Sequence, residues 1–194
     1  MPQYILVLGV FAHLASSSTY IASTWKGKTK PNRVTFLLWS IVPIIATVAA
    51  LSEGVGWAVV PVAMVGLLPF TIFLVSFANK NAYWKLTGFD YACGSFSLLA
   101  LLLWAITNDP ILAIVFAIVA DLVAGIPTVI KAYRFPETEH FGAYAGAMFN
   151  NTLVFFVVPE YTVAAVAFPA YIVSICLVIL FGIYRKRLRL RLSV

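Results

Sequence analysis

Long apolar stretches separated by short polar segments run through the whole chain of 194 residues. A helix that crosses a bilayer needs about 20 mostly apolar residues, and seven of the stretches approach or exceed that length. We predict helices over residues 4–24, 34–52, 56–78, 89–107, 110–130, 141–158 and 162–184. Glycine, proline and asparagine punctuate the segments between them, as expected of turns. The pattern therefore predicts an all-α integral membrane protein with seven transmembrane helices.

The basic residues follow the first, third, fifth and seventh predicted helices. They are Lys26, Lys28, Lys30 and Arg33, then Lys80 and Lys85, then Lys131 and Arg134, and finally Arg185, Lys186, Arg187, Arg189 and Arg191. The alternate connections contain Glu53, Asp109 and Glu160 and no basic residue. Because Lys and Arg concentrate in cytoplasmic loops, we expect the N-terminus outside and the C-terminus in the cytoplasm. The expected location is the cell inner (plasma) membrane.

The spacing of the predicted helices suggests a duplicated unit. Helices one to three begin at residues 4, 34 and 56, and helices five to seven begin at residues 110, 141 and 162, which are offsets of 106 or 107. A parallel copy of a three-helix unit requires one extra crossing, and the fourth helix provides it. We predict a first repeat at 1–79, a linker helix at 80–109, a second repeat at 110–184 and a basic cytoplasmic tail at 185–194.

Composition narrows the possible classes of protein. The chain is 62% hydrophobic and only 10% charged, whereas about 25% of the residues of a soluble domain are charged. This excludes a cytosolic enzyme, a disordered tail and a disulfide-rich secreted module. The net charge of +6 comes from clusters beside the spans, so nucleic-acid binding is not expected. Hydrolase, metalloprotease and nucleotide-binding motifs are absent, so we predict no enzyme, catalytic residue, cofactor or metal site.

The three-plus-one-plus-three layout, with the N-terminus outside, resembles the SWEET sugar transporters and the wider PQ-loop superfamily. The segment 125–128, Gly-Ile-Pro-Thr, precedes a basic loop and is similar to the family's proline-then-basic pattern, with Thr128 in place of the usual glutamine. The resemblance implies alternating access between two three-helix bundles, with prolines inside the membrane as hinges. Only Pro43 and Pro127 are expected in that role.

The resemblance also implies a cargo. A small neutral polar solute is expected, with a sugar as the first class. A nicotinamide riboside or other vitamin-type carrier of the same architecture is the alternative. A non-transporting membrane scaffold or assembly protein is the alternative from another class. The expected partners are the small-molecule solute and the lipid bilayer, and a homo-oligomer is left open.

Two titratable residues inside predicted spans are candidates for solute or proton contact, because polar groups in lipid are costly. Asp121, near the middle of the fifth helix, either binds a solute hydroxyl or a proton, or forms a hydrogen bond to a neighbouring helix. His13 shares a face of the first helix with Ser16, Ser17 and Tyr20. If the first and fifth helices meet, His13 and Asp121 form a candidate proton-coupling pair. The serines otherwise serve close helix packing.

Amides and aromatic rings complete the candidate solute site. Asn150 and Asn151 point about 100° apart on the sixth helix, so at least one is expected to face the protein interior. Their amides suit a hydroxylated or amide-bearing solute, and a hydrogen bond between helices is the alternative. Trp39 and Tyr144, 105 residues apart, are candidates for stacking on a sugar or nucleoside ring. Trp39 also fits an interfacial anchor.

The segment after the fifth predicted helix contains both signs of charge. Glu137 and Glu139 lie close in sequence to Lys131 and Arg134, so salt bridges within a solvated loop are expected. His140 is expected in the same solvated loop.

Overall fold

The computed structural model describes residues 2–52, 60–107, 110–158 and 160–192. Within these ranges the chain forms seven α-helices and two short 3-10 helices, and no β-strand. The α-helices are α1 (Pro2–Trp25), α2 (Arg33–Ser52), α3 (Val60–Val75), α4 (Gly88–Ile106), α5 (Pro110–Arg134), α6 (Phe141–Val157) and α7 (Val163–Leu192). The 3-10 helices are η2 (Lys80–Ala82) and η3 (Pro136–Thr138). The predicted all-α fold is confirmed.

Two helices extend beyond the ends predicted for them. α5 continues past residue 130 to Arg134, and α7 continues past residue 184 to Leu192. Both extensions contain basic residues, which interrupt an apolar run although Lys and Arg are good helix formers. The helix start predicted at residue 56 lies outside the described residues, as do Glu53 and Asp109.

Prolines lie inside more helices than expected. Pro43 and Pro127 are interior to α2 and α5, as predicted. Pro69 in α3 and Pro169 in α7 are interior as well, so the expectation of only two such prolines was wrong. A proline inside a helix removes one backbone hydrogen bond and favours a local bend. Within the described residues, interior prolines therefore lie in two of the helices α1–α3 and in two of the helices α5–α7.

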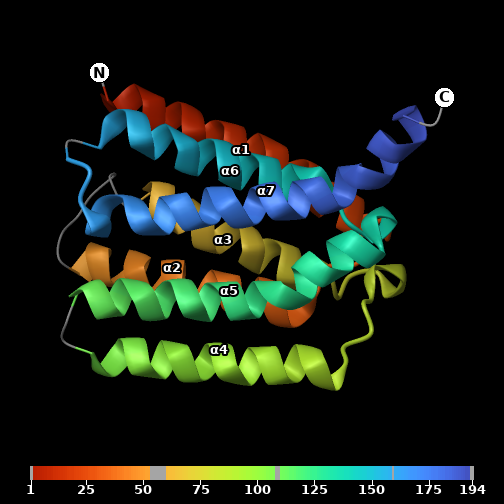
Figure 1. The fold of residues 1–194 in the computed structure, drawn as a ribbon, viewed down its shortest axis with the longest axis horizontal. Helices are drawn as coiled ribbons and strands as arrows, with labels where there is room; N and C mark the ends of the chain where they lie inside the picture. Colours follow the sequence, from red (N-terminus) through yellow and green to blue (C-terminus); the bar gives the residue numbers. More distant parts are fainter. Residues whose placement is uncertain (1, 53–59, 108–109, 159, 193–194) are drawn as a thin grey trace.

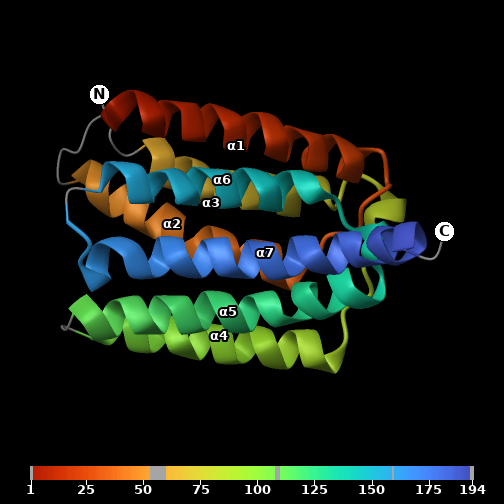
Figure 2. The same ribbon diagram turned by 45° about the horizontal axis from the view of Figure 1, so that its top comes forward.

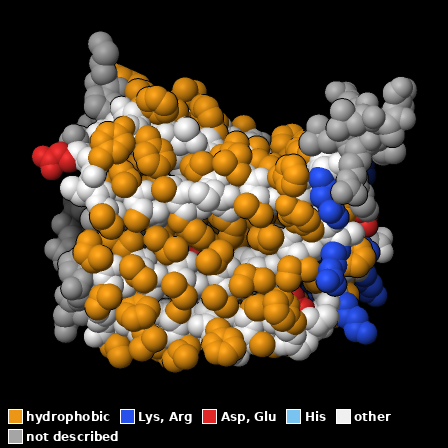
Figure 3. Space-filling view, viewed as in Figure 1, with side chains coloured by type: hydrophobic (Ala, Val, Ile, Leu, Met, Phe, Trp, Pro, Cys, Tyr) orange, Lys and Arg blue, Asp and Glu red, His pale blue; other side chains and the backbone are white. Residues whose placement is uncertain are grey.

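The outside of the helix bundle is apolar. Four helices in the described ranges are long and apolar enough to cross a membrane, namely Tyr4–Trp25, Gly88–Ile106, Ile114–Arg134 and Ala165–Arg185. Shorter apolar helices are Ala63–Val75 and Phe141–Val157. Large hydrophobic side chains cover the face shown in Figure 3, and Phe96 and Leu102 of α4 are among the most exposed. An apolar surface this extensive is not found on soluble monomers and indicates a helical membrane protein.

The described Lys and Arg side chains gather at one end of the bundle. The α1–α2, α3–α4 and α5–α6 connections lie at the same end as the C-terminus (Figure 1). On the face shown in Figure 3, the Lys and Arg side chains lie at this end. We call it the basic end, defined by Lys26, Lys28, Lys30, Lys80, Lys85, Lys131, Arg134 and Arg185. The segregation of basic residues read from the sequence is thus a property of the folded chain.

We call α1–α3 the first helix group and α5–α7 the second, after the two predicted repeats, and α1 and α6 form the main contact between them. α3 packs against α1 and α2, and α7 packs against α5 and α6. Between the groups, α1 lies along α6 and α2 packs against α5. α4 lies beside α5 at the edge of the bundle in both ribbon views (Figures 1 and 2) and also contacts α2.

Glycines bring α1 and α6 close together. A Cβ atom on Gly142 would lie 2.3 Å from the backbone oxygen of Ser16, and one on Gly146 would lie 3.0 Å from Cα of His13. The Ser16 hydroxyl donates a hydrogen bond to the Gly142 carbonyl at 2.6 Å. Small residues at such a contact let two helix backbones approach in a membrane. Ser16 therefore has the packing role that the sequence left open for the serines.

Replacing Gly142 by alanine is expected to separate α1 from α6, because the new methyl group would overlap the Ser16 backbone. Overpacking of this kind costs about 1–3 kcal/mol. The measurement is thermal unfolding of the detergent-solubilised variant. Gly88→Ala is the matched control, since a Cβ at Gly88 meets no atom within 4 Å. Equal melting temperatures for the two variants would contradict the close approach of α1 and α6.

Candidate functional site

A cavity of about 70 Å³ lies between the two helix groups. Side chains of α1, α2, α3, α5, α6 and α7 line it, and α4 contributes none in the described part of the chain. One water molecule needs about 10–15 Å³ of such space, so the cavity has room for roughly five. Sites for larger ligands measure about 300–1,000 Å³. A sugar-sized solute would therefore fit only after the helices lining the cavity move apart.

Two side chains of α1 carry polar atoms into this cavity. His13 and Ser17 are one helical turn apart, line the cavity, and are 4% and 0% exposed. Nδ1 of His13 and Oγ of Ser17 form no hydrogen bond with the described residues. A buried polar atom without a partner is costly, so a solute that offers hydroxyl or amide groups would be stabilised here. The sequence placed both residues on one face of the helix but favoured packing as the role of the serine.

Asp121 lines the same cavity from α5. Its Oδ2 accepts a hydrogen bond from the Tyr171 hydroxyl of α7 at 2.6 Å. Within the described residues, no hydrogen bond or ion pair joins Asp121 to His13. The predicted proton-coupling pair thus shares a cavity without direct contact. Tyr171 is a functional neighbour that sequence reasoning missed, since it lies 50 residues from Asp121.

The two asparagines of α6 have different surroundings. Asn151 lines the cavity, and its amide donates to the Ala147 carbonyl at 2.9 Å. Asn150 faces α1, where a Cβ atom on Gly9 would lie 2.6 Å from its Oδ1. Solute contact was predicted for both, but only Asn151 is among the cavity-lining residues of the described chain. The 100° step between neighbours on a helix is the reason.

Aromatic rings form part of the cavity wall. Trp39 and Tyr144, the two candidates for stacking on a solute ring, both line it. The Trp39 indole N–H donates to the backbone oxygen of Asp121 at 3.0 Å. The indole ring also packs closely against Gly125 of α5, since a Cβ atom added to this glycine would lie 2.9 Å from Cζ2 of Trp39. This contact across α2 and α5 places Trp39 inside the bundle rather than as an interfacial anchor. Pro43 also lines the cavity.

Pro127, the second predicted hinge, is away from the cavity. It lines a groove between α4 and α5 at the basic end, together with Trp84 and Phe135. The rings of Trp84 and Phe135 are 5.4 Å apart. Among the described residues, Pro127 therefore lines this groove and not the cavity.

The charges after α5 are buried rather than solvated, so the expectation of a solvated loop was wrong for Glu139. The Lys131 and Glu139 side chains form an ion pair and are 1% and 0% exposed. Lys131 belongs to α5 because the helix continues to Arg134, and this continuation directs its side chain beneath the α1–α2 connection. Glu137 remains exposed.

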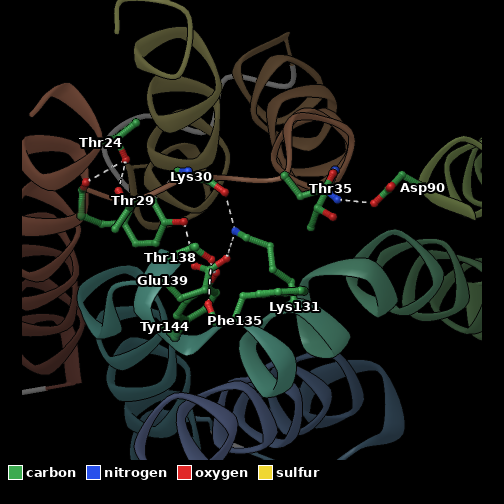
Figure 4. A network of polar contacts seen from close by, with 12 residues as sticks. Thr24, Thr29, Lys30, Thr35, Asp90, Lys131, Phe135, Thr138, Glu139 and Tyr144 are labelled. Atoms are coloured by element: carbon green, nitrogen blue, oxygen red, sulfur yellow. Dashed lines mark hydrogen bonds and ion pairs between the residues drawn. The ribbon is translucent and has the colours of Figure 1, made fainter. Parts of the chain in front are cut away.

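Figure 4 shows the polar cluster around this ion pair. Lys131 Nζ donates to Glu139 Oε1 and to the Lys30 carbonyl. The Tyr20 and Tyr144 hydroxyls each donate to Glu139 Oε2 at 2.8 Å. The Trp84 ring lies 5.0 Å from Lys131 Nζ, within range of a cation–π interaction. The expected salt bridge between Lys131 and Glu139 is thus confirmed. No local sequence signal marks Tyr20, Tyr144 and Lys30 as their further partners, because these residues come from α1, α6 and the α1–α2 connection.

His140 begins α6 and is half-buried. Its Nδ1 accepts a hydrogen bond from the Gly142 backbone N–H at 3.1 Å. Burial lowers the pKa of His140, against the opposing effect of the Glu139 carboxylate. A neutral imidazole can accept this bond, whereas the protonated ring cannot. The residue expected in a solvated loop is therefore the N-cap of a helix.

Comparison with known proteins gave no match to a family model, a curated protein or a solved structure. The function is therefore inferred from the chemistry of the cavity and the arrangement of the helices around it.

Ser17→Ala is expected to leave the melting temperature unchanged or to raise it, because the hydroxyl that it removes has no partner in the described chain. Thr35→Val is the matched control. The buried Thr35 hydroxyl donates to the Ala124 carbonyl at 2.7 Å, and its loss should cost about 1 kcal/mol. Thermal unfolding in detergent measures both variants. A similar loss of stability in Ser17→Ala would mean that its hydroxyl does have a partner in the protein.

Proposed function

We propose that this chain is a seven-span membrane transporter that moves a small neutral polar solute, with a sugar as the first candidate. Alternating access between the two three-helix groups, α1–α3 and α5–α7, would carry the solute across. The observation that carries the proposal is the cavity between these groups. It combines Asp121 and Asn151 of one group with the unpartnered polar atoms of His13 and Ser17 of the other.

The packing of the helices supports two related groups. If α1, α2 and α3 are exchanged with α5, α6 and α7, each major contact between these helices becomes another observed contact. The packing of α3 against α1 and α2 then corresponds to the packing of α7 against α5 and α6. The contact of α1 with α6 corresponds to the contact of α5 with α2. Parallel repeats of this kind, with a site at their interface, are one recognised way to build a transporter. This likeness in layout is also what the SWEET and PQ-loop resemblance implies.

The residues that line the cavity support the same relation. Lining residues of α1 and α2 have lining counterparts 108 positions later, in the pairs His13 and Asp121, Phe36 and Tyr144, and Pro43 and Asn151. For α3 and α7 the offset is 107, in the pairs Val65 and Ile172, Leu68 and Ile175, and Pro69 and Cys176. With the offset of 108, Trp39 corresponds to Ala147. The pairing of Trp39 with Tyr144, which assumed an offset of 105, is therefore replaced.

The chemistry of the cavity favours a neutral, hydroxylated solute. All Lys and Arg side chains with a described position lie at or near the basic end, so the cavity offers no cation to balance an anionic solute. His13 and Ser17 provide hydrogen-bonding atoms, and the ring of Trp39 provides an apolar wall. We propose that the basic end faces the cytoplasm of a cell inner (plasma) membrane, following the positive-inside rule.

A ring-bearing vitamin such as nicotinamide riboside is the second candidate. It is favoured by the aromatic side chains in the cavity wall, Phe36, Trp39, Tyr144 and Phe168. Aromatic faces pack well on flat heterocycles and on sugar rings alike. The choice between the two candidates is one outcome of the uptake experiment below.

Uptake of labelled sugars, nucleosides including nicotinamide riboside, and amino acids into proteoliposomes tests the proposal. Saturable uptake of one class is expected. Ser17→Ala should weaken its affinity about 3–10-fold, which is the effect of losing one neutral hydrogen bond. Ser18→Ala is the matched control, since Ser18 is exposed and bonds only within α1. No uptake of any class would favour a membrane scaffold, and equal effects of both variants would remove Ser17 from the site.

Asp121→Asn tests whether transport is coupled to protons. Asparagine has nearly the same shape and can still accept from Tyr171, but it cannot release or take up a proton. Uptake driven by a proton gradient should be lost, while exchange of solute across the membrane should continue. Uptake measured against external pH distinguishes the variants. The same pH dependence in wild type and Asp121→Asn would contradict a proton-coupling role.

A further inference from the structure

Aromatic rings gather on the side of the cavity toward the basic end. Tyr20 of α1, Phe36 of α2 and Tyr144 of α6 are each no more than 2% exposed, and the latter two line the cavity. The Tyr20 ring centroid lies 5.4 Å from that of Phe36 and 6.0 Å from that of Tyr144. All three lie in the helical turns next to the basic end. They form one continuous layer across both helix groups.

One carboxylate holds this layer in place. Glu139 accepts the Tyr20 and Tyr144 hydroxyls on Oε2 and the Lys131 ammonium on Oε1 (Figure 4). Lys131 also donates to the Lys30 carbonyl, and the Lys30 N–H donates to the Thr138 carbonyl at 2.9 Å. A buried charge is stable only when it is paired and hydrogen-bonded. Glu139 and Lys131 therefore stabilise a closed arrangement of the aromatic layer.

The bonds of this cluster divide into two kinds. Glu139 contacts Lys131 and Tyr144 within the second helix group, and these bonds survive if the group moves as a rigid body. Its bond to Tyr20 crosses to the first group, as do both bonds of Lys30. When the two groups separate at the basic end, the bonds within the second group can stay intact, and only the cluster's bonds of Tyr20 and Lys30 between the groups must break.

We propose that Tyr20, Phe36, Tyr144, Lys131 and Glu139 form a gate that closes the cavity at the basic end. The gate opens when Tyr20 leaves the Glu139 carboxylate and Lys30 leaves Lys131 and Thr138. Lys131 and Tyr144 then keep that carboxylate partnered, so opening does not leave a buried charge alone. This inference rests on the proposed alternating access, and it assigns the residues that control access from one side.

Tyr20→Phe and Tyr144→Phe form a matched pair for the test. Each removes one hydroxyl bonded to Glu139 Oε2 at 2.8 Å and keeps the ring. Tyr20→Phe loses a bond between the two helix groups, which should favour the open gate. Tyr144→Phe loses a bond within the second group. A hydrogen bond to a charged group shifts an equilibrium about tenfold or more.

The two native cysteines report the state of the gate. Cys176 lines the cavity, whereas Cys93 on α4 is equally buried and is not among the cavity-lining residues described. A water-soluble maleimide is added to the purified protein in detergent, and mass spectrometry follows modification of each thiol. In Tyr20→Phe, Cys176 should react about tenfold faster than in wild type, with Cys93 unchanged. In Tyr144→Phe, both rates should stay within about twofold of wild type.

Three results would overturn the gate. These are an unchanged Cys176 rate in Tyr20→Phe, an equal rise in Tyr144→Phe, or a parallel rise of Cys93, which would show that the bonds stabilise the fold as a whole. The assay contains no solute, so it is independent of the uptake screen. Uptake without the change in labelling would refute the gate alone, and the change in labelling without any uptake would refute transport alone.

Discussion

The burial of one carboxylate, Glu139, is the constraint on which the basic end of the structure depends. A charge inside an apolar bundle is costly unless it is paired and fully hydrogen-bonded. Glu139 meets this requirement with Lys131, Tyr20 and Tyr144, three side chains from three helices. Because none of these partners is close to Glu139 on the same helical turn, satisfying the charge requires α1, α5 and α6 to converge. The ordering of the α1–α2 connection through the Lys30 carbonyl follows from the same requirement.

At the centre of the bundle, by contrast, buried polar atoms lack hydrogen-bond partners among the described residues. His13 and Ser17 are buried beside a cavity and leave polar atoms without partners among the described residues. Across the cavity, the Asp121 carboxylate accepts a hydrogen bond from the Tyr171 hydroxyl. The described part of the fold therefore pairs the buried charge at the basic end, whereas it leaves His13 Nδ1 and Ser17 Oγ at the centre without partners, as it does Thr128 Oγ1 and Arg185 Nε elsewhere. The cavity, at about 70 Å³, is smaller than the about 300–1,000 Å³ of sites that hold larger ligands.

The two regions are joined by Tyr144. Its ring is part of the cavity wall and its hydroxyl bonds to Glu139. Movement of α6 that enlarges the cavity therefore also bears on the buried ion pair. α4 contributes no described residue to the cavity wall and packs at the edge against α5 and α2, and at the basic end its Asp90 accepts a hydrogen bond from Asn32 of the α1–α2 connection. Its role is consistent with a crossing that brings the second helix group parallel to the first.

Apolar runs and charge clusters in the sequence by themselves determined the helices, their approximate ends and the gathering of Lys and Arg at one end. These features are local or additive, so they need no knowledge of which helices touch. The sequence also identified Asp121, Trp39 and Asn151 as candidates for the solute site, because a polar or aromatic residue deep in an apolar run is conspicuous. Only the tertiary structure decided that Asn150 faces α1, that Ser17 faces the cavity and that Lys131 and Glu139 are buried together. A side chain's partner depends on helix rotation and on contacts between distant segments, and neither is encoded in the spacing of residues along one helix.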